Sequence, residues 1–269
     1  MIVYRYADEA LSVEHINSEK KDNDNYEMHV HHQAEILLLL KGQCTFHVEG
    51  TRYEMKEGDL IAIRPNEMHF NEPPSSGPYE RVIISFNTDL FKDFDTGDAL
   101  TSFLYKRREG QYNLYCSAYE NDDLKKEFDT IITPSSNNKI NSIASLLRIL
   151  LLLNDRFAEE NAESEPSTII EKIIRYINNN LDKNLTIQNV SDMFYISRSQ
   201  FCRVFKSTAG MSFGDYVIAK RMAAAHEKIR NGAKPSEIYV EYGFTDYSSF
   251  FRCYKKYYGF SPKQTKKFS

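Results

Sequence analysis

Two stretches of the C-terminal part of the chain match each other: SQFCRVFKSTAGMSF, residues 199–213, and SSFFRCYKKYYGFSP, residues 248–262. Aligned at an offset of 49 residues, they share six identities in fifteen positions, including Arg203 with Arg252. Repetition of this kind indicates a duplicated structural unit. The fold of this region therefore depends on what a single copy can form.

Each copy predicts a helix, a tight turn and a second helix. In the first copy, Thr186 is a good N-cap for IQNVSDMF, and Ser197 for the helix that follows. In the second copy, Gly243 is free to take a positive φ in the turn, and Asp246 caps YSSFFRCYKKYY. Two short helices joined in this way form the helix-turn-helix unit, whose second helix enters the major groove of DNA. We expect two such units, at residues 186–207 and 235–257.

The second helix of each unit is expected to bury one face and to expose another. Phe201 and Phe205, like Phe250 and Tyr254, have the spacing of a core-facing stripe. On the opposite face, arginine can donate two hydrogen bonds to guanine, serine suits several base edges, and lysine favours phosphate. Each such residue could instead be an ordinary solvated side chain, but the repeated arrangement favours DNA contact. The candidates are Arg198, Ser199, Cys202, Arg203, Lys206, Tyr247, Ser248, Ser249, Phe251, Arg252 and Lys255.

The segment SFGDYVIAKRMAAAHEKIRN, residues 212–231, is an uninterrupted helical pattern between the two copies. About 17 helical residues span roughly 25 Å. With side chains added at both ends, such a helix could hold two recognition helices about one DNA turn, ~34 Å, apart. One polypeptide would then contact two successive major grooves.

These features are specific enough to show a resemblance: residues 168–267 resemble the DNA-binding domain of the AraC family of bacterial transcription regulators. The resemblance is carried by LTIQNVSDMFYISRSQFCRVFKSTAGMSFGDYVIAKRMAAA and EIYVEYGFTDYSSFFRCYKKYYGFSPKQTKK, above all by GFTD and GFSP. The chain departs from the family's usual alanine at Ser191 and Tyr239. The resemblance implies double-stranded DNA as a partner, and RNA polymerase as a second partner if the protein is an activator.

Upstream, residues 2–87 have the pattern of short strands separated by glycine or proline turns. The stretches AEILLLLKG, CTFHVEG, TRYEM, DLIAIRP and YERVIISFN are rich in β-branched and aromatic residues, which favours a sandwich or barrel. Residues 88–135 are weakly helical. Residues 140–157 predict a helix with Ile140, Ile143, Leu147, Leu150, Leu151 and Asn154 on one face, broadened by Leu146, Ile149 and Leu153. So much apolar surface suits either a core helix or a dimerisation helix.

Histidines cluster ahead of the first of these apolar strands, in HVHHQAEILLLLKG. His29, His31 and Glu35 share one parity, so on an extended strand they would point to the same face. With His69 on a later strand, the spacing resembles the motifs of cupin barrels, in which the equivalent residues bind a divalent metal. Three imidazoles and a carboxylate would suit iron, manganese or zinc. Glu67 departs from the pattern, since it stands near where cupin enzymes tend to have glycine.

Many AraC family members carry a cupin-like N-terminal barrel, whose interior binds an effector, often a sugar, generally without metal. The resemblance therefore implies an effector pocket here, and polar groups inside an apolar barrel would suit a hydroxyl-rich ligand. The candidate effector-binding residues are His29, His31, Glu35, Tyr53, Arg64 and His69. No cofactor is expected; the alternative is a divalent metal at His29, His31, Glu35 and His69.

Composition shifts at the acidic and polar stretch FAEENAESEPSTII. Residues 1–165 hold 17 Lys+Arg against 30 Asp+Glu, net −13, whereas residues 166–269 hold 17 against 8, net +9. A basic C-terminal part joined to an acidic remainder suggests a polyanion partner for the C-terminal part alone. We expect an effector-binding and dimerisation domain at 1–157, a linker at 158–167 and a DNA-binding domain at 168–269.

The rest of the composition narrows the class of protein. The N-terminus lacks the pattern of a signal peptide, and the apolar runs are too short for a membrane helix. The four cysteines are far apart with no CxxC pair, which suggests reduced, mostly buried thiols. The sequence therefore predicts a cytoplasmic protein with no membrane partner.

The predicted fold is an α+β multidomain chain: an N-terminal cupin-like β-barrel with a helical dimerisation element, and a C-terminal all-α domain with two helix-turn-helix motifs. The predicted function is a sequence-specific transcription regulator, not an enzyme. It would respond to a small molecule, such as a sugar or related metabolite, and form a homodimer through helix 140–157. The alternatives are a metal-dependent cupin enzyme fused to a DNA-binding domain, and a regulator without an effector.

Overall fold

The computed structural model describes residues 1–18, 29–73, 76–93, 95, 99–107, 110–160 and 168–267, without the side chains of 158–160, 266 and 267. The chain divides into two compact units, residues 1–27 with 33–165, and residues 28–32 with 166–269. Residues 161–167 of the predicted linker lie outside the described part. Within the described part, no helix is both long enough and apolar enough to cross a membrane.

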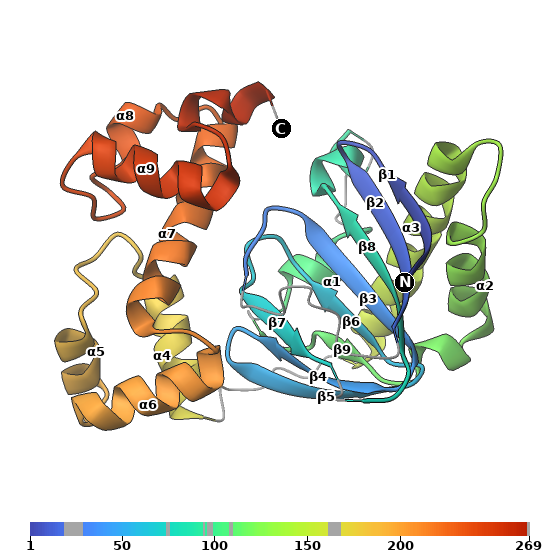
Figure 1. Cartoon of the computed structure of the whole chain (residues 1–269), viewed down its shortest axis with the longest axis horizontal. Helices are drawn as coiled ribbons and strands as arrows, with labels where there is room; N and C mark the ends of the chain where they lie inside the picture. Colours follow the sequence, from blue (N-terminus) through green and yellow to red (C-terminus); the bar gives the residue numbers. More distant parts are fainter. Residues whose placement is uncertain are drawn as a thin grey trace. The chain divides into compact units, whose positions relative to one another are not determined.

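Two antiparallel sheets form the N-terminal unit (Figure 1). The larger sheet has the order β1-β2-β8-β3-β6-β9, with bounds Ile2–Ala7, Leu11–Ser18, Tyr79–Phe86, Ala34–Lys41, Leu60–Ile63 and Leu114–Tyr115. The smaller sheet has the order β5-β4-β7, with bounds Thr51–Lys56, Gln43–Val48 and His69–Glu72. Every apolar stretch that predicts a strand forms one, and the predicted β-rich N-terminal fold is confirmed.

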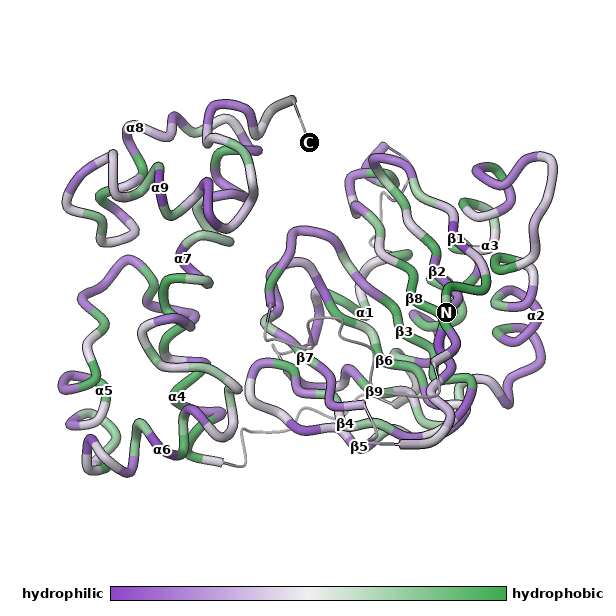
Figure 2. Tube along the Cα trace, viewed as in Figure 1, coloured by the Kyte–Doolittle hydropathy of each residue, from purple (hydrophilic) through white to green (hydrophobic). Residues whose placement is uncertain are grey.

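Strand β3 is central, because it pairs with β8 on one side and with β6 on the other. Its alternate residues enter different cores. Leu37 and Leu39 pack with residues of the smaller sheet, whereas Ile36 and Leu38 pack with the helices. Burial on both faces explains the continuous apolar run ILLLL, which an amphipathic strand would not need. Figure 2 shows hydrophobic residues following the central strands of the larger sheet.

Helices cover the outer face of the larger sheet. They are α1 (Ser102–Tyr105), α2 (Asp122–Ile131) and α3 (Asn138–Glu160), with 3-10 turns η1 (Thr88–Phe91) and η2 (Ala118–Glu120). Helix α3 confirms the predicted helix at 140–157, but its predicted face is partly wrong. The buried stripe is Leu146, Ile149, Leu150, Leu153 and Phe157, while Ile140 is 66% exposed and Leu151 36% exposed. The helix rests on the sheet along the i, i+3, i+4, i+7 and i+11 positions from Leu146, which turns the other two residues outward.

The C-terminal unit is all helical. Its elements are α4 (Ile169–Asn178), α5 (Ile187–Met193), α6 (Arg198–Ala209), α7 (Phe213–Arg230), α8 (Pro235–Ile238), α9 (Tyr247–Tyr258) and η3 (Pro262–Lys267). Figure 1 shows α7 running from the α4–α6 group to the α8–α9 group. Helix α8 is shorter than EIYVEY predicts, because the chain turns after Tyr239, whose ring meets that of Tyr247 edge-on.

All four cysteines are free thiols. Cys44 is buried and Cys253 half-buried, but Cys116 and Cys202 are exposed. The expectation that most of the thiols are buried is therefore wrong. The reason is local: Cys202 lies on the outward face of α6, and Cys116 lies just after the edge strand β9.

Candidate nucleic-acid interface and ligand site

Helices α6 and α9 begin and end in the same way. Ser197 accepts a hydrogen bond from the backbone of Gln200 at 3.3 Å, and Asp246 accepts one from Ser249 at 2.8 Å. Each helix ends at a glycine with positive φ, 73° at Gly210 and 76° at Gly259. Both ends satisfy backbone groups that the helix itself leaves open. The predicted caps are confirmed, and the two recognition helices have equivalent boundaries.

Apolar residues of α6 and α9 hold both helices against the rest of the C-terminal unit. Phe201, Phe205, Phe250 and Tyr254 are each fully buried. The candidate DNA-contacting residues lie on the other faces. Exposed are Arg198, Ser199, Cys202, Arg203, Lys206, Ser248, Arg252 and Lys255, while Tyr247, Ser249 and Phe251 are half-buried. Each recognition helix thus presents an arginine and a lysine at equivalent positions.

A chain of hydrogen bonds orders the start of α9. The Ser249 hydroxyl donates to Asp246 at 2.8 Å and accepts from the guanidinium of Arg252 at 3.1 Å. The hydrogen bonds from Ser249 lower the pKa of Asp246. Arg252 is therefore partly oriented before any DNA arrives. In the first unit, the cap hydroxyl of Ser197 instead lies 3.4 Å from that of Ser199.

A buried ion pair joins the β6–β7 turn to the loop before β9 in the N-terminal unit. The Arg107 guanidinium donates to both carboxylate oxygens of Glu67, each at 2.8 Å, and both side chains are fully buried. Burial alone would raise the pKa of Glu67, but the charge and hydrogen bonds of Arg107 lower it to about 2. Glu67 raises the pKa of Arg107 in return, against the effect of burial. The pair is ionised and bidentate, with two charge-assisted hydrogen bonds, which is the strongest geometry for such an interaction.

Glu67 also collects donors from the surrounding backbone and side chains. It accepts from Gly110 N at 2.9 Å, Asn113 Nδ2 at 3.1 Å and Arg64 N at 3.0 Å. The Tyr53 hydroxyl donates to Gly110 O at 2.7 Å, which adds β5 to the same network. Two predicted effector-binding residues, Tyr53 and Arg64, thus lie beside a network built on Glu67.

Sequence reasoning missed most of this network. Glu67 was expected only as a departure from the cupin pattern, and Arg107 and Asn113 lie in the stretch that is merely weakly helical. Spacing could not find them, because 40 residues separate Glu67 from Arg107. The requirement for glycine at Gly110 is likewise visible only in the fold, where a Cβ would come within 2.6 Å of Val48 O and 2.7 Å of Glu49 Cβ.

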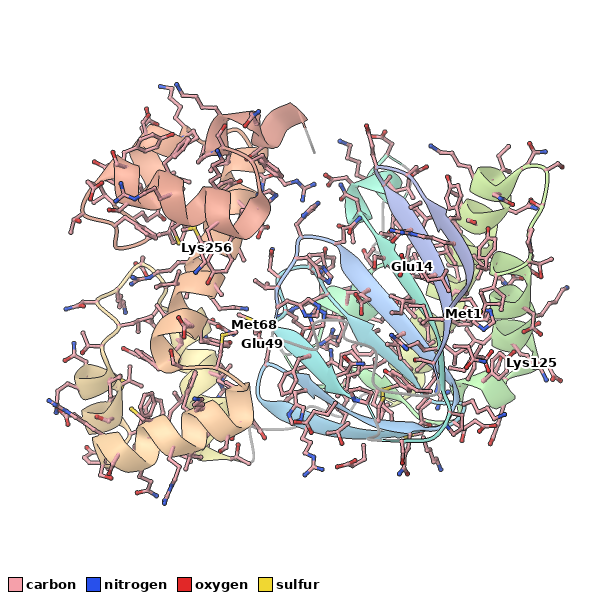
Figure 3. All side chains as sticks on the ribbon, in the orientation of Figure 1. Met1, Glu14, Glu49, Met68, Lys125 and Lys256 are labelled. Carbon is pink, nitrogen blue, oxygen red and sulfur yellow. The ribbon has the colours of Figure 1, made fainter. Side chains whose placement is uncertain are left out.

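The turn that Gly110 contacts is itself tied to β7. Glu49 N donates to Met68 O at 2.9 Å, and Met68 N donates to the Glu49 carboxylate at 2.7 Å, two residues that lie close together in Figure 3. This pairing places the next residue, His69, which is 1% exposed. Its Nδ1 is 2.8 Å from Glu67 O. His69 is therefore held between the Glu67 turn and β4.

The predicted metal-binding residues are divided between the two compact units. Glu35 and His69 belong to the N-terminal unit, and His29 and His31 belong to the C-terminal one. Glu35 has the parity of Leu37 and Leu39 on β3, so it shares the strand face turned toward the smaller sheet, to which His69 belongs. A metal site formed by these four residues stays a prediction.

A cavity of about 500 Å³ opens elsewhere in the N-terminal unit. Residues of β4, β5 and the end of β7 line it, together with Asp59 and Cys116. Asp59 accepts from Lys56 N at 3.0 Å and from Ser117 N at 2.8 Å, so its carboxylate fixes the cavity wall. None of these residues was predicted as part of a ligand site.

The two units therefore define a class of protein: a DNA-binding regulator with a β-rich ligand-binding domain and two helix-turn-helix units. Two family models match the chain, an AraC-like ligand binding domain over residues 16–163 and a helix-turn-helix domain over residues 190–267. The chain belongs to the AraC family of transcription regulators. The recognition made from its sequence motifs is confirmed.

Two curated relatives align with this chain along most of their length. The Msm operon regulatory protein of Streptococcus mutans is 23% identical over 96% of this chain and 92% of its own. The probable transcriptional regulator LumQ of Photobacterium leiognathi is 25% identical over 87% of this chain and 89% of its own. Fatty-acid-bound ToxT of Vibrio cholerae is 13% identical, covers 97% of this chain and 96% of its own, and has a TM-score of 0.41. A similarity that low says nothing about the ligand of this chain.

Proposed function

We propose that this regulator reads two successive major grooves through α6 and α9. The observation that carries the proposal is the pair of equivalent outward faces, with Arg203 and Lys206 on one helix and Arg252 and Lys255 on the other. Arginine reads guanine edges and lysine neutralises phosphate, so each face can supply both specificity and affinity. The basic balance of residues 166–269 supports the same surface electrostatically.

Selection of binding sites from random double-stranded DNA tests this function. The full chain is expected to enrich a site with two short conserved blocks about one helical turn, ~10 base pairs, apart. Enrichment of a single block would leave one recognition helix without a role. No enrichment at all over the input DNA would contradict sequence-specific binding.

We also propose that the effector is a small hydroxyl-rich metabolite bound by polar residues of the N-terminal unit. The supporting observations are that the Arg64 side chain lies 3.5 Å from the Glu67 carboxylate, that His69 lies against the Glu67 backbone, and that the Tyr53 hydroxyl reaches Gly110 in the same network. Such groups can donate and accept hydrogen bonds within an otherwise apolar fold. Binding would act by shifting the population of states that can engage DNA.

A panel of sugars and related metabolites tests the effector. A cognate compound should raise the melting temperature of the full chain, because it binds the native state alone. Tyr53→Phe and His69→Ala should reduce the shift, whereas Thr45→Ala, in the separate cavity, should not. A shift lost only with Thr45→Ala would move the effector site to that cavity.

A divalent metal is the second candidate ligand, supported by the histidine-rich stretch HVHHQAEILLLLKG and by His69, whose side chain is buried. Neutral imidazole is a good ligand for zinc and other first-row metals. Metal analysis of protein purified without chelator tests it. Near-stoichiometric metal that is lost in both His31→Ala and His69→Ala would establish the site, and metal-free wild-type protein that takes up no added zinc would exclude it.

We further propose a homodimer formed through the outward face of α3. Ile140 and Leu151 are exposed on a helix whose other face is fully buried. Large exposed apolar residues on one helix face often mark a partner surface. RNA polymerase would be a further partner if DNA binding activates transcription.

A further inference from the structure

One arginine in the middle of α7 contacts the segment that leads into the first helix-turn-helix unit and the turn of the second. Arg221 Nε donates to Leu181 O at 2.9 Å, and its Nη2 donates to Lys183 O at 2.6 Å. Both carbonyls belong to the segment between α4 and α5, which leads into the first unit. The planar guanidinium therefore holds two backbone carbonyls of the segment that leads into the first helix-turn-helix unit.

The same guanidinium lies against the turn of the second unit. A Cβ atom on Gly243 would come within 2.4 Å of Arg221 Nη1 and 2.9 Å of its Cζ. Gly243 has a φ of +76°, so this position needs glycine for two reasons, its backbone conformation and the arginine beside it. The turn between α8 and α9 therefore packs closely against the Arg221 guanidinium.

Apolar packing supports the same joint. Leu181, whose carbonyl Arg221 holds, packs against the core of the second unit, which includes Met222, Phe250 and Tyr254. At the start of α7, the Tyr216 hydroxyl donates to Asn178 at 3.1 Å and ties the end of α4 to the same helix. The α4–α5 segment is therefore shared by both units instead of belonging to the first alone.

We propose that Arg221 is a positioning residue that sets the angle between the two units, and with it the spacing of the two DNA blocks that the protein accepts. The inference rests on the proposed two-groove binding. A rotation of about 10° at the joint, over a lever of ~17 Å, moves a recognition helix by roughly 3 Å, which is close to the rise of one base pair, ~3.4 Å. Small losses of order at Arg221 are thus enough to change the preferred spacing.

A spacing library tests the proposal. The two blocks selected by the wild-type protein are joined by spacers from three base pairs shorter to three base pairs longer than the selected one, and binding of the full chain is measured to each. Wild type should prefer one spacing. Arg221→Ala should spread binding over neighbouring spacings and lose about ten-fold or more in affinity at the original one, since a shifted helix forfeits at least one base contact.

Three further variants sharpen the test. Lys172→Ala removes an exposed cation from α4, which is neither recognition helix, and should leave the spacing profile unchanged. Arg221→Lys keeps the positive charge but loses the planar guanidinium that donates to two carbonyls. It should give a spacing profile between those of wild type and Arg221→Ala. Gly243→Ala should also broaden the profile, because its Cβ displaces the guanidinium and its positive φ strains the turn.

Each possible result has a defined meaning. A folded Arg221→Ala protein with a single unchanged spacing overturns the inference. So does an equal loss of affinity at every spacing, which would indicate a role in folding alone. If wild-type protein binds one block alone as tightly as both together, or binds equally well at every spacing, the proposed two-groove function fails and this inference fails with it. The wild-type profile alone shows that outcome, so it is distinguishable from a failure of the Arg221 inference only.

Discussion

At the residue scale, the most direct consequence of the structure concerns Arg203 and Arg252. Both side chains are exposed at equivalent positions of the recognition helices. We expect Arg203→Ala and Arg252→Ala each to cost about 1–3 kcal/mol of binding and to relax base preference at specific positions. Lys255→Ala should weaken binding evenly and lower the salt slope by about one. Binding measured on the selected site and its single-base variants checks this, and an unchanged base preference in both arginine variants would show that the recognition faces are wrongly assigned.

Glu67 leads to a prediction about stability. Replacing it with Gln leaves Arg107 buried without a countercharge, which typically costs about 3–5 kcal/mol. The matched control is Glu54→Gln, because Glu54 is 68% exposed and its pair with Arg52 is solvent-screened. Denaturant unfolding of both variants measures the difference. Equal stabilities would mean that the buried pair adds nothing beyond what its neighbours supply.

The same pair predicts how the N-terminal unit responds to acid. The folded-state pKa of Glu67, about 2, lies below the ordinary value of 4.5. A depressed carboxyl pKa contributes stability that is complete above the unfolded value and is lost as pH falls through the folded one. We therefore expect wild type to lose stability between pH 4.5 and 2 more steeply than Glu67→Gln. Melting temperatures across that range provide the measurement, and parallel curves would contradict the prediction.

Residue-scale prediction from sequence succeeded where the cause is local. Thr186, Ser197 and Asp246 were identified as caps because a cap acts on the next few residues, and all three accept the expected hydrogen bonds. Glu67 was misjudged because its partners come from a loop 40 residues away. The cupin motif tends to have glycine near this position, so comparison with it assigns no role to Glu67. The spacing of residues along the chain gives no sign of the ion pair that Glu67 forms with Arg107.

At the scale of elements, α3 separates core from surface in a way that can be tested. Leu151→Asp places a charge on the exposed face and should weaken a dimer while leaving the fold intact. Leu150→Ala, on the buried face, should instead lower stability by about 2–5 kcal/mol. Sedimentation of each variant, with melting temperatures alongside, distinguishes the two faces. A wild-type chain that is monomeric at all concentrations would remove the proposed dimer.

Helices with a strong hydrophobic period were predicted well, but the choice of the face that each helix buries was predicted less well. The length of α3 follows from its run of apolar residues, but Ile143, Leu146, Leu147 and Leu150 leave the choice of the buried stripe open. Contact with the sheet decides it, and that contact is tertiary. Helix α8 shows the converse: its pattern extends to Tyr242, but the turn required before α9 ends it at Ile238.

At the scale of the whole molecule, the repeat, the strand pattern of residues 2–87, the charge asymmetry and the family resemblance together predicted two kinds of domain and the class of protein. The ligand could not be predicted. The cavity of about 500 Å³ is lined from β4, β5, β7 and two loops, and the Glu67 network joins β5, the β6–β7 turn and the loop before β9. Sites assembled from so many separated segments depend on the fold as a whole, so no local pattern marks them.

The central place of β3 has a consequence for the nascent chain. The segment EILLLL is apolar and suited to β structure, which makes it prone to intermolecular strand pairing when unprotected. In the native unit β8 and β6 cover both of its edges. Because β8 is made about 40 residues later, a fragment that ends before Tyr79 leaves one edge of β3 open. We expect such a fragment to aggregate on expression, and one that ends after Glu160 to remain dispersed; Leu38→Lys in the shorter fragment should restore its solubility.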